Sequence, residues 1–568
     1  MSTYLVNVTT LNSSTRTGWV DEPNMRGSWG ILLPCVSTLL VCSWSVMHLN
    51  LPAKSSSNTE KLIPYLYWCT IGIFGPELAI WAAWRQLMSA RALKREIEEA
   101  KVVTSFNMCT RLTWTQLTSY NFSLTHAFYA VMGGYAFDCN QSFDSEGEVF
   151  WSKTQRITLT PKGVLLLASC GQLPEISAQN IADKSKVDEL GKLIACLQAG
   201  WFTVQIITRL ACHLPITLLE VTVVGHVLCA LVLYTLWWYK PRRIEEPNIL
   251  KGSWSAPLAA FMVMSSHVNA APNSILPGFQ AEQQHPEVMA LKFRVMPDGS
   301  SVHVQSISDD EHEMDNLDHA LQVRTKTGMS LMYEEEIDLE DTVVDWKGQA
   351  EARLRLACLA IQKYSAVRTL LRRPICGEER KYATALAAYP EMPKVCRKKR
   401  EREAMLQNVS PWLECDIQHL ACHTASDWPH DGLVRTTGGL VMGTVLWAAS
   451  IAFSAVHIAA WNAGFPTEAE AWLWRFSSMY VGFSGLLWAF LHVMAELSAT
   501  LWWTWYDIMI GEASQVLTML VTALCSMCGV IYILARAYLV VEAFVELRSL
   551  PTMAYAIPQW SVSIPHIG

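Results

Sequence analysis

The sequence predicts an all-α integral membrane protein with about seven transmembrane helices and a mixed α/β polar loop module. The 568 residues are 51% hydrophobic and only 17% charged, which is too apolar for an ordinary soluble enzyme of this size. Seven apolar segments approach the roughly 20 residues that a helix needs to cross hydrocarbon. Many of the 24 tryptophans stand at the ends of these segments, where indole rings favour the headgroup level of a bilayer. These three observations together predict an all-α integral membrane protein.

Each predicted span is a continuous apolar run bounded by polar residues. The seven runs are 29–50, 64–84, 193–211, 217–239, 438–461, 476–499 and 516–538. Helix is the form we expect, because isolated strands would leave backbone groups unpaired in lipid. The stretch 124–137 is an eighth alternative that is short for a span, and its Gly133-Gly134 pair permits close helix packing. Residues 1–28 are polar and lack an apolar h-region, so we expect the first span to act as an uncleaved anchor.

These runs divide the chain into alternating membrane and polar regions. The predicted regions are a polar N-terminal segment (1–28), a first membrane helix pair (29–87), a polar or interfacial region that includes 124–137 (88–192), a second membrane helix pair (193–239), a large soluble cytosolic loop (240–437), a three-helix membrane region (438–540) and a tail (541–568). Within the loop, residues 290–306 alternate apolar and polar residues around a Pro-Asp-Gly turn, which predicts a β-hairpin.

Two signals disagree about which side of the membrane holds the N-terminus. Seven spans with the N-terminus inside gather most span-flanking basic residues on the cytosolic side, as the positive-inside rule requires. These residues are Arg85, Arg91, Lys94, Arg95, Lys184, Lys186, Lys192, Lys240, Arg242 and Arg243. The same topology leaves the glycosylation sequons at Asn7, Asn12, Asn121 and Asn140 in the cytosol. An eighth span at 124–137 would change the parity and place the N-terminus outside, and both topologies keep the loop after Arg243 cytosolic.

Ionisable side chains inside the apolar runs are the candidate functional residues, because they are costly in hydrocarbon and need a partner or a role. The candidate catalytic residues are Glu77, Glu220, His457, His492 and Glu496, and Arg209 and His226 are further buried ionisable groups. Glu77 follows Pro76, which frees a backbone carbonyl beside the carboxylate. His492 and Glu496 are four residues apart and share a helix face. The alternative is structural: buried histidines donate to carbonyls, and a glutamate pairs with Arg209 to fix helix register.

The connection between the spans 438–461 and 476–499 contains a specific turn signal. Gly464-Phe465-Pro466 ends one helix, and Thr467 with Glu470 forms the S/T-x-x-E pattern that starts the next. This turn explains the glutamates without chemistry. His457 lies one turn inside the span 438–461, and we expect it to lie near His492 on the following antiparallel helix, 476–499.

Several stretches together resemble a largely uncharacterised family of fungal multi-pass membrane proteins. They are 26–53, 74–86, 124–137, 181–209, 455–477 and 537–551 with the terminal "IPHIG". The resemblance implies a fungal origin and a shared architecture in both membrane-rich halves, and it is weak in the loop 240–437. It implies no catalytic residue.

Three classes of function fit these residues. The first, which we favour slightly, is an enzyme or accessory protein in lipid, isoprenoid or secondary-metabolite biosynthesis that acts on an apolar small-molecule substrate. The second is a transporter or channel with a proton or ion path through buried Glu and His groups. The third is a membrane scaffold or receptor-like protein. The lipid bilayer is the expected partner, and nucleic acid is not, because no basic stripe with interleaved aromatics occurs. Motif spacing assigns no cofactor, metal or protein partner.

Overall fold

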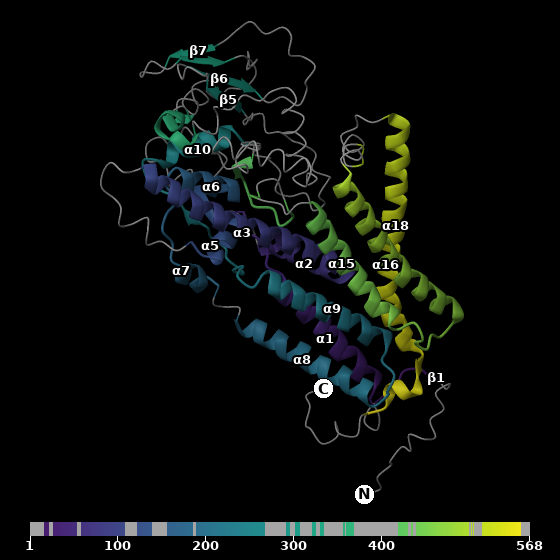
Figure 1. The fold of residues 1–568 in the computed structure, drawn as a ribbon. Coiled ribbons are helices and arrows are strands. Elements are labelled where there is room, and N and C mark those ends of the chain that lie inside the picture. Colours follow the sequence, from purple (N-terminus) through teal and green to yellow (C-terminus); the bar gives the residue numbers. More distant parts are fainter. Residues whose placement is uncertain are drawn as a thin grey trace.

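The computed structural model describes residues 16–21, 26–53, 58–107, 122–138, 156–185, 189–266, 291–295, 301–306, 321–324, 330–333, 356–357, 359–367, 419–429, 433–434, 439–498, 501, 504 and 514–557. In this part of the chain a bundle of long helices carries a smaller α/β unit at one end, and Figure 1 shows that unit around α6 and α10. We call this the sheet end of the bundle. The opposite, far end holds the short strand β1 (Arg16–Thr17).

Six helices run between the sheet end and the far end. They are α1 (Ser28–Val46), α8 (Glu189–Ala211), α9 (Leu218–Leu236), α15 (Gly439–Ile458), α16 (Glu468–Leu497) and α18 (Gln515–Val545). All except α15 contain stretches that are long and apolar enough to cross a membrane, and the apolar helix Gly443–Ile458 within α15 is shorter. The five long helices confirm that five of the predicted runs are helices of membrane-crossing length and composition, which is consistent with a membrane protein.

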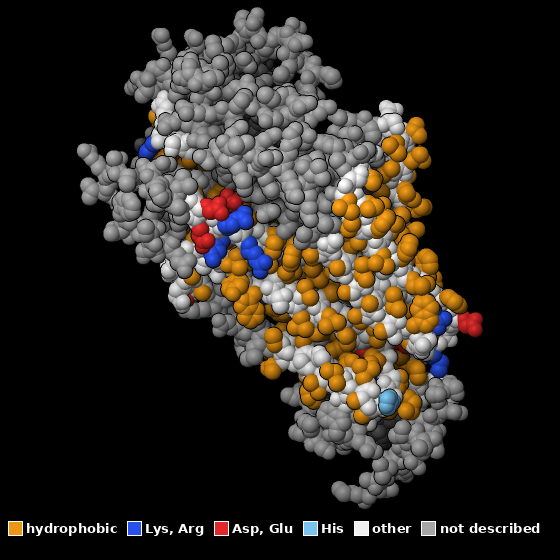
Figure 2. All heavy atoms as spheres, in the orientation of Figure 1, with side chains coloured by type: hydrophobic (Ala, Val, Ile, Leu, Met, Phe, Trp, Pro, Cys, Tyr) orange, Lys and Arg blue, Asp and Glu red, His pale blue; other side chains and the backbone are white. Residues whose placement is uncertain are grey.

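Apolar side chains also cover much of the outside of the bundle. Figure 2 shows a nearly continuous hydrophobic face over α15, α16 and α18. Phe483 on α16 and Ile533 on α18 are 64% and 67% exposed. A soluble protein rarely exposes apolar patches of this extent, whereas lipid contact requires them.

The second predicted span, 64–84, is not a straight helix. α2 (Asn58–Phe74) and α3 (Pro76–Asn107) are separated at Gly75 and bent by 115°. The amide of Gly75 closes the last turn of α2 on the carbonyl of Ile71, and Pro76 has no N–H with which to continue the helical ladder. The apolar run 64–84 is therefore helical on both sides of Gly75 but is not one continuous helix, and a membrane span there stays a prediction.

Both arms of this broken helix lie toward the sheet end. Tyr65 of α2 packs against Trp44, near the end of α1, with ring centroids 5.2 Å apart. Gln86 of α3 accepts a hydrogen bond of 3.0 Å from the indole of Trp237, just past the end of α9. Since α1 and α9 both end there, α2 and α3 form a hairpin whose tip at Gly75 points into the bundle.

The α/β unit combines segments that are far apart in the sequence. Its sheet has the order β4-β2-β3-β9, with strands β2 (Tyr135–Asp138), β3 (Arg156–Leu159), β4 (Asn248–Ile249) and β9 (Ala421–Cys422). The helices α5 (Leu124–Val131), α6 (Pro161–Ser169), α7 (Ala178–Asp183) and α10 (Ser255–Met264) complete it. The long α3 packs against α5 and α6. The sheet therefore joins the predicted interfacial region 88–192 to the predicted loop.

The short segment 124–137 is part of this unit. Its helix α5 has only eight residues and is followed by strand β2, so it is too short to be an eighth span. Gly133 adopts a positive φ of 85°, and a side chain at Gly134 would collide with the ring of Tyr129. The two glycines thus form the tight turn from helix to strand.

Two further sheets lie in the described part of the chain. β5 (Leu291–Val295) and β6 (Ser301–Ser306) pair antiparallel, which confirms the hairpin predicted for 290–306. They join β7 (Leu321–Arg324) and β8 (Ser330–Tyr333) in the order β5-β6-β8-β7. At the far end, β1 pairs with β10 (Leu550–Pro551), between the short helices η5 (Glu546–Arg548) and η6 (Thr552–Tyr555).

Candidate functional site

The tip of the α2–α3 hairpin holds a buried ion pair. Glu77 lies in the first turn of α3, where the positive end of the helix dipole favours a carboxylate. Its partner is the guanidinium of Arg536 on α18, and both side chains are only 4% exposed. The second carboxylate oxygen accepts a hydrogen bond of 2.7 Å from the hydroxyl of Tyr532. The helices α3 and α18 therefore meet at two charges inside the bundle.

Neighbouring groups complete the surroundings of the ion pair. The hydroxyl of Ser450 on α15 lies 2.9 Å from that of Tyr532. The guanidinium of Arg536 lies over the ring of Phe453, 4.0 Å from its centroid, and such a cation–π contact is stronger where water is excluded. We use the name break site for Glu77, His226, Ser450, Tyr532 and Arg536.

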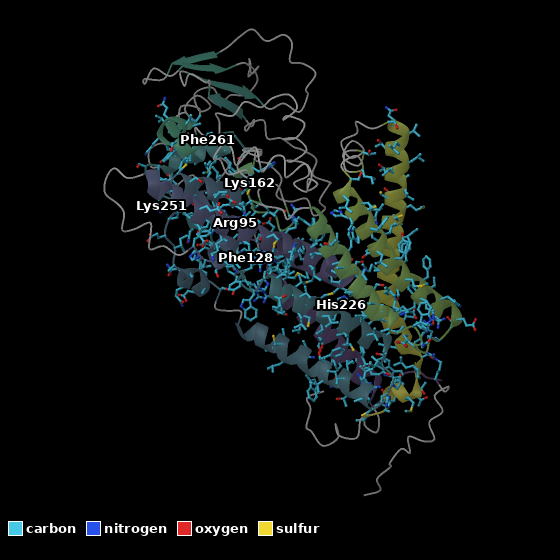
Figure 3. The ribbon with its side chains drawn as sticks, in the orientation of Figure 1. Arg95, Phe128, Lys162, His226, Lys251 and Phe261 are labelled. Carbon is cyan, nitrogen blue, oxygen red and sulfur yellow. The ribbon has the colours of Figure 1, made fainter. Side chains whose placement is uncertain are left out.

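His226 connects α9 to the hairpin tip. Figure 3 shows it within the helical bundle. Its Nδ1 lies 2.8 Å from the carbonyl oxygen of Thr222, and its Nε2 lies 2.8 Å from that of Ile73. Ile73 belongs to the last turn of α2, where carbonyls have no following helical N–H groups to accept. The imidazole thus caps the end of α2 inside the bundle.

His457 and His492 do not come together. The Nδ1 of His457 lies 2.9 Å from the carbonyl oxygen of Phe453, and its own carbonyl accepts from the indole of Trp474. The ring of His492 packs instead beside Gly443. Gly443 and His457 are fourteen positions apart on α15, about 21 Å at helical rise. The expectation that the two histidines are neighbours is therefore wrong, because it took no account of how far α16 runs back along α15.

Glu496 lies in α16, but its side chain is outside the described residues. The predicted partnership of His492 and Glu496 thus stays a prediction. Among the described residues, no group of three or more His, Cys, Asp and Glu side chains is placed to hold a metal ion.

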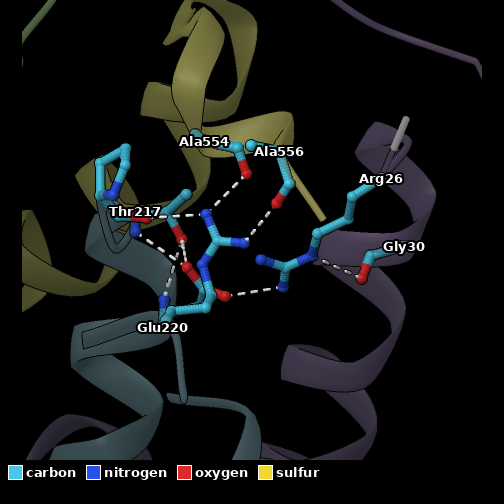
Figure 4. A network of polar contacts seen from close by, with 8 residues as sticks. Arg26, Gly30, Thr217, Glu220, Ala554 and Ala556 are labelled. Atoms are coloured by element: carbon cyan, nitrogen blue, oxygen red, sulfur yellow. Dashed lines mark hydrogen bonds and ion pairs between the residues drawn. The ribbon is translucent and has the colours of Figure 1, made fainter. Parts of the chain in front are cut away.

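Glu220 belongs to a separate network at the far end (Figure 4). It forms a capping box with Thr217 at the start of α9 and an ion pair of 2.6 Å with Arg26. Arg209 does not bond to it there. The Arg209 guanidinium donates to the carbonyls of Pro215, Ala554 and Ala556. Glu220 therefore caps the start of α9 and joins this helix to Arg26, in the segment before α1. This is the structural role considered for a buried glutamate, but its partner is Arg26 instead of Arg209.

The sheet end contains a third buried polar cluster. The ammonium of Lys240 donates to the side-chain oxygens of Asn50 and Gln86, each at 2.9 Å, and to the carbonyl of His48. Burial lowers the pKa of Lys240 to about 7, although nearby Asp427 acts in the opposite direction. Burial likewise raises the pKa of Asp427, whose carboxylate accepts from the amide of Asn50.

Arg242, like Lys240, is one of the span-flanking basic residues and is buried at this end. The guanidinium of Arg242 donates to the carbonyls of Trp44 and Met47, at 2.8 and 3.1 Å. With Lys240 it neutralises the negative C-terminal end of α1. These two residues still mark one side of the bundle, but they act as caps of a helix rather than as solvated charges.

Sequence reasoning missed Tyr532 and Arg536, which complete the ion pair. An available signal was an arginine within the apolar run "VIYILARAYLVV", four residues after a tyrosine. A charge inside such a run needs a partner, and residues four apart share a helix face. The same rule that selected Glu77 would have selected Arg536.

The fold and the site define a helical protein with membrane-length helices and an ion pair at a broken helix. The model of a family of unknown function (DUF8562) matches residues 1–277 and 439–567, so the chain belongs to this family. The match includes all five residues of the break site and omits 278–438, most of the predicted loop. This is consistent with the resemblance to an uncharacterised family, whereas the fungal origin and the multi-pass nature of that family stay predictions. No curated protein and no solved structure matches the chain.

Proposed function

We propose that the protein is a multi-pass membrane transport protein whose solute or ion path passes through the break site. The observation that carries this proposal is the buried pair of Glu77 and Arg536 at the tip of a broken helix. Intramembrane charges are expensive and mark substrate or ion pathways. Broken helices in membranes are tolerated where they are buried in protein or line a cavity, and transporters place their binding sites at such breaks.

The proposal includes a topology with six crossings and one re-entrant hairpin. The α1, α8, α9, α15, α16 and α18 helices cross, and α2–α3 enters and leaves on the sheet side. The 20 residues of α15 reach about 30 Å, enough for the hydrocarbon core. The basic residues near the sheet end then place that end in the cytosol. Both termini lie on the opposite side, which removes part of the conflict between the charges and the sequons.

The arrangement of the buried ionisable groups fits a transport role better than a single acid–base site. His457 and His492 are separated, and Glu220 has a capping role, so three of the five candidate catalytic residues form no common site. Glu77 is instead paired with a permanent cation, as in a gated ion or solute site. The scaffold alternative depends on the loop 240–437, most of which is outside the described residues.

A biosynthetic enzyme or accessory protein is the second candidate. The hydrogen bond from Tyr532 to Glu77 in apolar surroundings favours it, since such a pair suits proton transfer to an apolar substrate.

One deletion experiment separates the two candidates. The gene is deleted, and metabolites are measured separately in cells and in medium, with the wild-type gene and Glu77→Gln as complementing alleles. A transporter changes the distribution of a compound between cells and medium, and only the wild-type allele restores it. Loss of a compound from both compartments would support the enzyme instead. An unchanged profile in both compartments would contradict both candidates.

A further inference from the structure

The two contacts of His226 place different demands on its protonation state. Both ring nitrogens lie 2.8 Å from carbonyl oxygens, those of Thr222 and Ile73. A carbonyl oxygen only accepts hydrogen bonds. A neutral imidazole has one N–H and one lone pair, so it can satisfy only one of these two carbonyls. The doubly protonated imidazolium donates to both.

The second buried histidine nearby provides the contrast. The Nδ1 of His457 lies 2.9 Å from the carbonyl oxygen of Phe453, and its Nε2 lies 3.5 Å from the hydroxyl of Thr222. A hydroxyl donates as well as accepts. Neutral His457 therefore satisfies both nitrogens, as the donor to Phe453 and the acceptor from Thr222, and it needs no second proton.

The charges around His226 act in opposite directions. The charged and titratable groups facing it are Glu77 of α3, Arg536 of α18 and His457 of α15. Glu77 and the negative end of α2 favour a positive imidazolium, whereas burial and the Arg536 guanidinium oppose it. The ring of Phe453 contacts both His226 and Arg536. The imidazole of His226 is perpendicular to this ring, and the guanidinium of Arg536 lies over its face. Burial is the largest of these influences and favours the neutral imidazole, so a bound proton is held only by the two carbonyl contacts and is readily given up.

We propose that a proton is the coupling ion of the transport reaction and that His226 binds it. The neutral imidazole takes one proton from water on one side of the membrane and becomes imidazolium, with a gain of one positive charge. In this state Nε2–H holds the Ile73 carbonyl and fixes the hairpin tip. Return of the Nε2 proton to water on the other side leaves the neutral ring with Nδ1–H toward the Thr222 carbonyl and a lone pair facing the Ile73 carbonyl, and the tip is released. This inference rests on the proposed transport function.

Hydrogen–deuterium exchange of the hairpin tip tests the inference without any transport assay. The full-length protein in lipid nanodiscs is compared at about pH 4.5 and about pH 8, and the lower value lies well below the ordinary histidine range because burial favours the neutral ring. Exchange is corrected for its intrinsic pH dependence. Amides of residues 66–80 are expected to exchange about ten-fold more slowly at the lower pH, the factor that corresponds to one hydrogen bond to a charged group.

The matched variants are His226→Gln and His457→Gln. His226→Gln is expected to remove the pH dependence, because its amide does not titrate, whereas His457→Gln retains it. A tip with the same corrected exchange at both pH values in the wild-type protein would overturn the inference, and so would a pH dependence that survives His226→Gln. If His226→Gln does not fold, the wild-type comparison still decides.

Failure of this inference can be distinguished from failure of the transport function. A pH-dependent tip in a protein whose deletion changes no distribution between cells and medium would leave a proton site without transport. A pH-independent tip in a protein whose deletion does change that distribution would leave a transporter that is not coupled to a proton at His226.

Discussion

Glu77 and Arg536 are 459 positions apart in the chain and form an ion pair in which both side chains are almost fully buried. The pair connects the tip of the α2–α3 hairpin to the last long helix. Because both charges are removed from water, each depends on the other for compensation. The hairpin and the C-terminal helix are thus energetically coupled.

Removal of one partner is expected to cost more than removal of both. Glu77→Gln or Arg536→Gln alone should destabilise the fold by about 3–5 kcal/mol, since each leaves an uncompensated buried charge. The double variant Glu77→Gln/Arg536→Gln should be more stable than either single variant. Thermal unfolding in nanodiscs measures this cycle. Tyr532→Phe is the control, with an expected cost of about 1 kcal/mol for one hydrogen bond. Additive single effects would show that the two charges are not coupled.

Gly163 is expected to be intolerant of any side chain. It lies in the first turn of α6, and an added Cβ would lie 2.1 Å from the carbonyl oxygen of Leu420, next to β9. Gly163→Ala should therefore separate α6 from β9 and cost about 2–3 kcal/mol in unfolding free energy. Gly200 in α8 has no atom within 4 Å of its added Cβ. Gly200→Ala should be neutral or stabilise by up to about 1 kcal/mol. Equal effects of the two substitutions would contradict this close approach.

The buried ammonium of Lys240 is expected to make stability depend on pH. Its pKa is about 7 in the folded protein, below the ordinary 10.5. Between these values the unfolded chain binds the proton and the folded chain does not, so the contribution of Lys240 to stability rises with pH. The difference in unfolding midpoint between the wild type and Lys240→Met should therefore shift in favour of the wild type from about pH 7 to about pH 10. A constant difference over this window would exclude this titration.

The topology predicts which glycosylation sequons are used. Asn7 and Asn12 precede β1 at the far end, on the non-cytosolic side in the proposed topology. Asn121 and Asn140 belong to the cytosolic side. All four residues are outside the described part of the structure. In a secretory-pathway membrane, endoglycosidase should lower the apparent mass of the wild type. Only Asn7→Gln and Asn12→Gln should reduce that shift, and Asn121→Gln and Asn140→Gln should not. Glycans at Asn121 or Asn140 would contradict the topology.

Hydropathy predicted most of the long helices but not the direction of the chain at Gly75. An apolar run has the same composition whether it crosses the membrane or turns back, and a proline at position 76 does not specify the angle between the two helices. The sheet β4-β2-β3-β9 was not predicted, because β4 and β9 have two residues each. Strands this short have no alternation that sequence analysis can detect.

The candidate site was predicted in part. Glu77 was selected for its position in an apolar run, but the partner that gives it a role is on the last helix. His226 was one of several buried histidines, and no sequence pattern distinguishes it from His457. The two histidines differ in the group that faces Nε2, which is the Ile73 carbonyl for His226 and the Thr222 hydroxyl for His457. That difference arises from packing between α9, α2 and α15.

The re-entrant hairpin is tested most directly by the side of the membrane on which each of its two arms lies. Lys61 on α2 and Lys94 on α3 are 33% and 39% exposed. Lys61→Cys and Lys94→Cys are introduced separately after replacement of the exposed Cys196 and Cys212. Sealed vesicles of known orientation are treated with a membrane-impermeant maleimide, and labelled peptides are identified by mass spectrometry. The account predicts that both positions are labelled from the cytosolic side. Labelling from opposite sides would show that residues 58–107 cross the membrane, and it would contradict the re-entrant hairpin.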